Sequence, residues 1–184
     1  MALADGMGSG VKAENESKVV IELIERFLDA GFEKDFAVKM VNSVMFIKSG
    51  EDNFSTLDIC SVDLYSGIGE FIKTGATDAY IVRDKRAKAI YSSSLPVGIL
   101  DNIEIEKIGF KLNDSDIIIM LTDGAADVIK RLGGSHWVEK TLEKINSKNP
   151  KDISDFILMK LKEIENGCAK DDMTVMAGVF WEQL

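Results

Sequence analysis

The spacing of hydrophobic positions changes twice along the chain and divides it into three parts. Apolar residues first recur every three or four positions, which predicts helices over 13–30 and from about 34 to 48. Short apolar or alternating runs broken by Gly, Ser and Asp then predict strands over 56–64, 69–74, 79–83, 87–92, 103–111 and 116–121. Helical spacing returns over 125–132, 137–147 and 153–165, and a last strand is expected over 173–181.

This order of elements constrains the fold class. Helices, a run of strands, more helices and one final strand do not give the strand–helix alternation of a parallel sheet. The order favours an α+β fold in which two antiparallel sheets are flanked by helices. Strict alternation over 103–111 is typical of an exposed or edge strand, whereas 116–121 is apolar enough to be the most buried one.

Composition narrows the class of protein. The chain has 184 residues, of which 46% are hydrophobic and 29% charged, as expected for one globular domain. A net charge of -9 argues against a nucleic-acid or anionic membrane surface, which would need clustered Lys and Arg. The longest apolar run is Ile117 to Leu121, far short of the roughly 20 residues that span a bilayer, and no signal peptide is recognisable. We expect a cytoplasmic location.

The cysteines and the histidine exclude some chemistries. Cys60 and Cys168 give no disulfide framework, and Cys168 is better interpreted as an incidental loop thiol than as a soft metal ligand. His136 is the only histidine, which disfavours zinc hydrolases and Ser-His-Asp catalysis. We expect His136 to lie at the surface or at a helix start.

Three aspartates stand at the edges of apolar runs. Asp5 begins Asp-Gly-Met-Gly-Ser-Gly, Asp123 lies in Thr-Asp-Gly, and Asp171 begins Asp-Asp-Met-Thr. Carboxylates that a fold brings together must pair, protonate or bind metal. The glycines after Asp5 allow positive φ and close approach of the backbone to an ion or phosphate, although such a loop before a helix is usually only a connection.

The three aspartate motifs taken together are more specific than any one of them. Asp-Gly-x-Gly, Thr-Asp-Gly and Asp-Asp-Met-Thr, in that order, resemble the metal-dependent PPM family of serine/threonine protein phosphatases. Within that family the sequence is most similar to the phosphatase domains of stage II sporulation protein E from spore-forming bacteria. The resemblance extends from Ala4 nearly to the end of the chain and includes the segments 56–58, 73–77 and 95–99. It implies one phosphatase domain over 1–184 with the αββα sandwich of that family.

The resemblance also implies a metal site. Two Mn²⁺ or Mg²⁺ ions would share a bridging water that attacks the substrate phosphorus, with no covalent phosphoenzyme. Asp5 would bridge the ions, the Gly6 carbonyl would be a backbone ligand, and Asp123 and Asp171 would complete one ion's shell. Two further acids are weaker candidates. Asp127 would support the ligands or hold a third, weak metal, although helix starts commonly carry acids, and Asp172 would mainly support its loop.

Two departures from the family pattern affect these expectations. Family members carry a strand pair with another metal-binding aspartate upstream, whereas only four residues precede Asp5 here. The chain is therefore expected to be N-terminally shortened and to lack the first strands, leaving a sheet edge that forms a homodimer or local disorder around 1–10. Met7 stands where many members have a proposed general acid, which a thioether cannot replace.

The resemblance implies a substrate class but leaves alternatives open. It implies phosphoserine on a regulatory protein of the anti-anti-sigma type, in sporulation signalling, within a parent protein anchored to the membrane through upstream segments. Lys73 is a candidate contact for phosphate or peptide, although a solvated hairpin explains it as well. The alternatives are a catalytically impaired fragment that acts as a protein-binding module and a phosphomonoesterase for small molecules.

Overall fold

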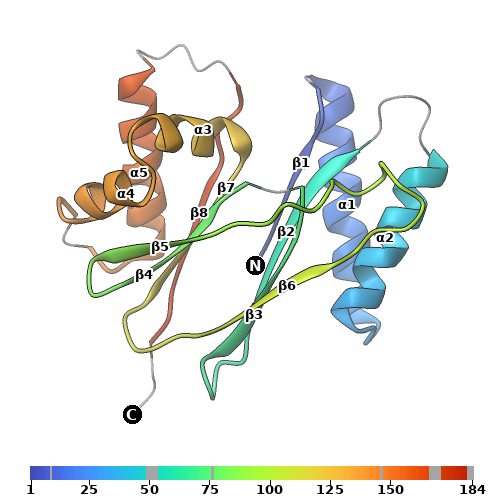
Figure 1. Ribbon diagram of the computed structural model, residues 1–184, viewed down its shortest axis with the longest axis horizontal. Helices are drawn as coiled ribbons and strands as arrows, with labels where there is room; N and C mark the ends of the chain where they lie inside the picture. The colour runs from blue at the N-terminus through green and yellow to red at the C-terminus, as the bar shows by residue number, and fades with distance from the viewer. Residues whose placement is uncertain (9, 49–53, 76, 146, 166–170, 182–184) are drawn as a thin grey trace. The chain divides into compact units, whose positions relative to one another are not determined.

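The computed structural model describes residues 1–8, 10–48, 54–75, 77–145, 147–165 and 171–181 (Figure 1). They form two compact units, each with a hydrophobic core of its own. The first unit comprises Met1–Ser61, Glu70–Ala76 and Ser92–Ile108, and the second comprises Val62–Gly69, Thr77–Tyr91 and Gly109–Leu184.

The first unit contains the expected pair of helices. Helix α1 spans Val11–Asp29 and α2 spans Lys34–Lys48, close to the predicted ranges. The chain leaves α1 through Gly31, whose φ of 84° is a conformation that glycine adopts at little cost. The turn is short because Phe32 donates its backbone N–H to the carbonyl of Phe27.

The first sheet has the strand order β1-β2-β3-β6. Its strands are β1 (Ala2–Gly6), β2 (Ser55–Val62), β3 (Ile68–Thr74) and β6 (Glu106–Lys111). Both helices lie against one face of this sheet, where Val20 and Ile24 of α1 join Leu57 and Ile72 of the strands in one buried cluster (Figure 1). The expectation of local disorder over 1–10 is wrong for residues 2–6, because they form a strand.

The second unit contains the other sheet, with the order β5-β4-β7-β8. Its strands are β4 (Ala79–Arg83), β5 (Arg86–Ile90), β7 (Ile117–Leu121) and β8 (Val175–Val179), and every pairing is antiparallel. Helices α3 (Asp123–Arg131), α4 (Ser135–Leu142) and α5 (Pro150–Ile164) pack on it through one core cluster. Helix α4 ends five residues before the predicted position, because the chain turns after Leu142.

The expected fold class is confirmed. Two antiparallel sheets with flanking helices account for all thirteen elements found in the described part of the chain. The strand β6 is at one end of the first sheet's order, as its alternating sequence predicted, and β7 lies inside the second sheet. Among the described residues, no helix combines the length and hydrophobicity that crossing a bilayer requires.

Candidate functional site

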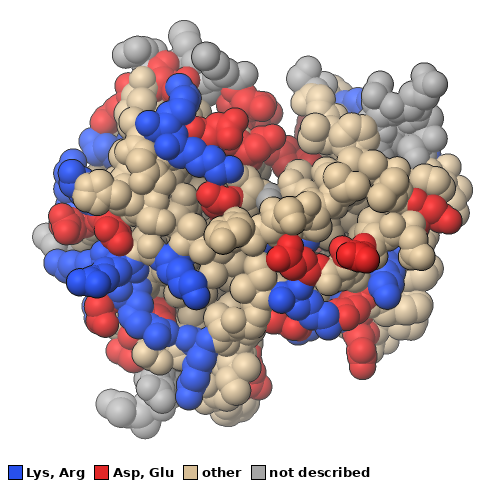
Figure 2. All heavy atoms as spheres, in the orientation of Figure 1, with Lys and Arg blue, Asp and Glu red and all other residues tan. Residues whose placement is uncertain are grey.

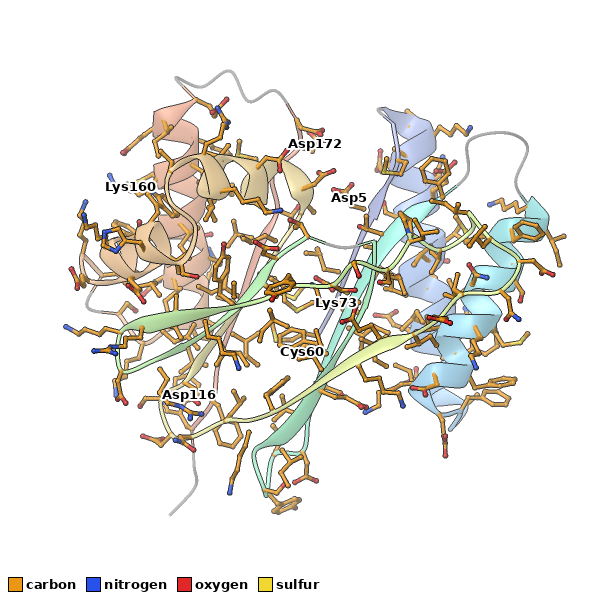
Figure 3. All side chains as sticks on the ribbon, viewed as in Figure 1. Asp5, Cys60, Lys73, Asp116, Lys160 and Asp172 are labelled. Atoms are coloured by element: carbon orange, nitrogen blue, oxygen red, sulfur yellow. The ribbon has the colours of Figure 1, made fainter. Side chains whose placement is uncertain are left out.

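Asp5 is held in the first unit by strand pairing. It lies in β1 opposite Thr56 of β2, and its side chain is half-buried. The Ser55 hydroxyl donates to the Asp5 carbonyl at 2.8 Å, and the Thr56 hydroxyl approaches the same oxygen at 3.5 Å. These contacts fix the backbone of Asp5, which Figure 3 labels on β1. The sequence pattern predicts a loop at Asp5, whereas the structure places this residue in a strand that Ser55 supports.

The glycines that follow Asp5 are needed for the turn into α1. Gly6 is buried, and a Cβ built on it would overlap the carbonyl oxygen of Ala13, so only glycine lets α1 approach β1 this closely. Gly8 and Gly10 have φ values of 101° and 79°, a region that other residues rarely adopt. The loop therefore carries the chain from Asp5 directly into the helix. Met7 in this loop is 41% exposed.

The second unit joins the other two motifs by hydrogen bonds. Thr122, the last residue before α3, donates its backbone N–H to the carbonyl of Thr174 at 3.2 Å. Its hydroxyl accepts the backbone N–H of Thr174 at 2.9 Å and approaches the carbonyl oxygen of Asp172 at 3.3 Å as a donor. Residues about fifty positions apart are thus held together by one threonine.

Gly124 brings the two aspartate-bearing segments into direct contact. A Cβ built on Gly124 would overlap the carbonyl oxygen of Asp172 and would lie 3.1 Å from the Cβ of Asp171. The residue after Asp123 is therefore packed against the segment that carries Asp171. Glycine is required here for close approach rather than for a special φ, because Gly124 is part of helix α3.

The carboxylates of Asp123 and Asp171 are oriented in the same manner. The Asp123 carboxylate accepts the backbone N–H of Gly124 at 2.7 Å, and that of Asp171 accepts the N–H of Asp172 at 2.9 Å. Both side chains remain exposed. Asp123 is also the first residue of α3, where the helix dipole favours negative charge. The pair offers exposed carboxylate oxygens with a fixed orientation.

The chemistry of these donors fits a hard divalent cation. Mg²⁺ and Mn²⁺ favour carboxylate, carbonyl and water oxygens, and Mg²⁺ usually retains several waters beside one or two carboxylates. Within the described ranges, however, no three Asp, Glu, His or Cys side chains come together as a ready ligand cluster. The second unit provides two neighbouring carboxylates, and the first provides Asp5 and the Gly6 carbonyl.

A small pocket of about 300 Å³ adjoins Asp171 in the second unit. Gly124, Asp127 and Arg131 of α3 line it together with Glu165 and Asp171. The guanidinium of Arg131 donates to the Glu165 carboxylate at 2.7 Å, so the pocket holds opposite charges. Asp127 is exposed and faces this pocket, whereas Asp172 contacts Thr122 through its backbone carbonyl.

Lys73 is not placed as a substrate contact would require. Its side chain is completely buried in the first unit, and its ammonium forms an ion pair with Asp58 (Figure 3). The expected contact with phosphate or peptide is therefore not supported. His136 is exposed near Glu139, as expected for a surface residue. Cys168 lies outside the described residues.

The comparisons with known proteins assign this arrangement to a family. Residues 1–178 match the family described as stage II sporulation protein E (SpoIIE). The chain belongs to the SpoIIE family. It is 30% identical over 176 residues to stage II sporulation protein E of Bacillus subtilis (strain 168), an alignment that covers 95% of this chain and 21% of that protein. The chain thus spans about a fifth of this curated SpoIIE relative.

Solved structures agree with this assignment. The PP2C phosphatase domain of SpoIIE from Bacillus subtilis, with a fragment of its regulatory domain, superposes with a TM-score of 0.86 at 30% identity, covering 96% of this chain and 52% of that chain. A serine/threonine phosphatase of S. agalactiae shares the fold, with a TM-score of 0.79 at 14% identity and coverage of 98% and 86%. The chain therefore has the fold of PP2C phosphatases.

Proposed function

We propose that this SpoIIE chain is a divalent-metal-dependent phosphatase domain that hydrolyses phosphoserine or phosphothreonine on a protein. Asp5, the Gly6 carbonyl, Asp123 and Asp171 are its proposed metal ligands, and Mn²⁺ or Mg²⁺ its proposed cofactor. Family membership supports this proposal. Because the chain spans only part of its curated relatives, the activity of the whole protein belongs to the proposal as well.

The strongest support for the proposal is the junction between the segments of Asp123 and Asp171. Thr122 and Gly124 hold these two segments against one another, and both carboxylates remain exposed. Neither carboxylate forms an ion pair with a described residue, so both remain available to a cation. Exposed carboxylates of fixed orientation are suitable ligands for a hard divalent cation.

The remaining chemistry follows from the side chains that are present. When bound, divalent cations supply Lewis acidity and lower the pKa of the water that they hold. Asp123 and Asp171 provide the compensating negative charge, and their bonds to backbone N–H groups limit how far they move. The only histidine lies beside Glu139, so no described Ser–His pair offers covalent catalysis. Direct attack by water is therefore favoured. Because the Met7 thioether cannot donate a proton, bound water or another group would protonate the leaving oxygen.

The proposed substrate is phosphoserine on a regulatory protein of the anti-anti-sigma type, in sporulation signalling. This part rests on the resemblance to the SpoIIE phosphatase domains. Asp127 and Asp172 are placed near the proposed ligands but are expected to have smaller roles. Their substitution to asparagine should change metal binding less than substitution of Asp123 or Asp171.

Metal binding provides the first test. Calorimetric titration of the full chain with Mn²⁺ should show binding that Asp123→Asn and Asp171→Asn each weaken at least about ten-fold, the loss of about 1.4 kcal/mol. Asp155→Asn is the matched control, because Asp155 is an exposed aspartate on α5 that pairs with Lys151. Equal Mn²⁺ affinity in all four proteins would overturn the proposed ligand set.

Turnover then separates the alternative functions. A phosphoserine protein and a small phosphomonoester such as p-nitrophenyl phosphate are compared with Mn²⁺ and with EDTA. We expect the protein substrate to be favoured, EDTA to abolish activity and no phosphoenzyme to be trapped. Preference for the small ester would support a phosphomonoesterase, and Mn²⁺ binding without turnover would support an impaired, partner-binding fragment.

A further inference from the structure

An open groove lies in the first unit, at the start of the edge strand β6, of which residues 106–108 belong to that unit. Its volume is about 740 Å³, within the range of about 300–1,000 Å³ that is common for ligand clefts. The groove is lined by residues 93–95 on one side and by Leu100 and 102–106 on the other. Both lining segments belong to the unit that contains α1 and α2, so the groove is formed within one compact unit.

The strand beside the groove has only one neighbour in its sheet. Strand β6 pairs with β3 and ends the order β1-β2-β3-β6. An edge strand presents a row of backbone N–H and C=O groups that another extended chain can pair with. Glu106, the first residue of β6, lines the groove, and residues 102–105 lead into it, so a segment in the groove would reach the start of this edge.

The groove has an apolar floor and an acidic wall. Leu95 and Leu100 are each about half exposed, at 48% and 47%, and Ile103, which also lines the groove, is buried. Glu104 and Glu106 are exposed on the wall. The Ser92 hydroxyl donates to the Glu106 carboxylate at 2.6 Å, which orients that group. Leucines this exposed beside fixed carboxylates favour a partner with both apolar and basic side chains.

The cations nearest in sequence do not neutralise this wall. Lys107 is paired with Asp35 of α2 at 2.5 Å. Among the described residues, neither Glu104 nor Glu106 forms an ion pair. Figure 2 shows acidic side chains on largely uncharged surface over this part of the first unit, with basic groups beside them. The wall therefore offers unpaired negative charge to a ligand.

We propose that the groove binds an extended, basic segment of a protein partner, which adds to the edge of β6 as a further strand. Its Lys or Arg side chains lie against Glu104 and Glu106, and its intervening apolar side chains cover Leu95 and Leu100. Alternation of the two kinds of side chain is required, because successive residues of a strand point to opposite faces. The interaction is independent of the proposed metal chemistry.

A peptide-binding measurement tests this proposal without relying on phosphatase activity. The probe is a fluorescein-labelled peptide in which Lys and Val alternate over eight residues, titrated with the full chain in EDTA and followed by anisotropy. Glu104→Lys with Glu106→Lys should weaken binding at least about ten-fold, because two attractions become repulsions. The matched control is Glu143→Lys with Glu163→Lys, which makes the same change in net charge at exposed positions of the second unit and should leave binding unchanged.

Two further measurements distinguish strand addition from general electrostatic attraction to an acidic protein. A peptide with Pro replacing two central Val residues should bind at least about ten-fold more weakly, because Pro cannot donate to a strand ladder. When the Lys–Val peptide is bound, the backbone amide hydrogens of residues 103–108 should exchange with solvent more slowly. The proposal is overturned if the control variant weakens binding equally, if the Pro peptide binds as well, or if exchange slows elsewhere instead.

Discussion

Lys73 and Asp58 form an ion pair in the interior of the first unit, with Lys73 Nζ lying 2.5 and 2.6 Å from the two carboxylate oxygens. Neither side chain is more than 1% exposed. The pair joins β3 to β2, and the next residue, Thr74, donates its hydroxyl to the carbonyl of Leu57 in β2. Two charges without access to water depend on each other, so removing either one leaves the other uncompensated.

The first prediction concerns the stability of this pair. Lys73→Met should lower the free energy of unfolding by about 3–5 kcal/mol at pH 8, because it leaves the Asp58 carboxylate buried without a cation. The double variant Lys73→Met with Asp58→Leu should recover most of that loss, because no buried charge remains. Urea denaturation measures both values. A double variant as unstable as the single one would show that packing around Lys73, and not its charge, is what matters.

The second prediction is a dependence of stability on pH. Burial raises the pKa of Asp58 from 3.8 to about 6, and the charge and hydrogen bonds of Lys73 oppose this only in part. Because the folded-state pKa lies above the unfolded one, this contribution to stability is complete below pH 3.8 and is lost as pH rises through about 6. Relative to the double variant, the wild-type chain should lose stability as pH rises through this range.

The comparison with the double variant isolates the Lys73–Asp58 pair from the other ionisable groups. Exposed carboxylates titrate alike in both proteins and cancel in the difference. Cys60, on the same strand, stays neutral throughout, because burial raises the pKa of its thiol to about 12. Unfolding free energies are measured in urea from pH 3.5 to 7. A difference between the two proteins that stays constant, or grows with pH, would contradict the prediction.

The helices and most strands could be predicted from the spacing of apolar residues, but strand β1 could not. Both helices of the first unit and all three of the second follow the spacing of their apolar residues. Strand β1 was missed because Ala2–Gly6 has neither alternation nor strong strand formers. Its strand conformation comes from pairing with β2, where Asp5 faces Thr56, which is a tertiary effect.

The residues proposed as metal ligands can be picked out from the sequence, but the contacts that hold their segments cannot. Asp5, Asp123 and Asp171 stand out in the sequence because short motifs surround them. The role of Thr122 depends on contacts with residues 50 and 52 positions away, which no local pattern indicates. The predicted substrate contact of Lys73 is not supported for a similar reason. Its partner Asp58 lies on the neighbouring strand, and burial of the pair depends on strand register.

The third prediction concerns the close contact at Gly124. Gly124→Ala should lower the free energy of unfolding by about 1–3 kcal/mol, because the new methyl group overlaps the carbonyl oxygen of Asp172. Alanine otherwise favours helix, so a loss of stability is specific to this contact. Gly109→Ala is the control, since a Cβ there would have no described atom outside its immediate surroundings within 4 Å. Destabilisation of Gly109→Ala alone would contradict the packing argument.

The fourth prediction tests whether Thr122 positions the proposed metal ligands. Thr122→Val keeps the shape of the side chain but removes the hydroxyl that accepts the N–H of Thr174 and reaches the carbonyl of Asp172. The loss of these bonds should cost about 1–2 kcal/mol of stability and should also weaken Mn²⁺ binding, because the segment carrying Asp171 is no longer tied to that of Asp123. Thr122→Ser retains the hydroxyl and should restore most of both properties. Calorimetry and urea denaturation on the two variants measure affinity and stability separately. If Thr122→Val loses stability but binds Mn²⁺ as tightly as the wild-type chain, the threonine supports the fold alone, and the junction between the two motifs does not position metal ligands.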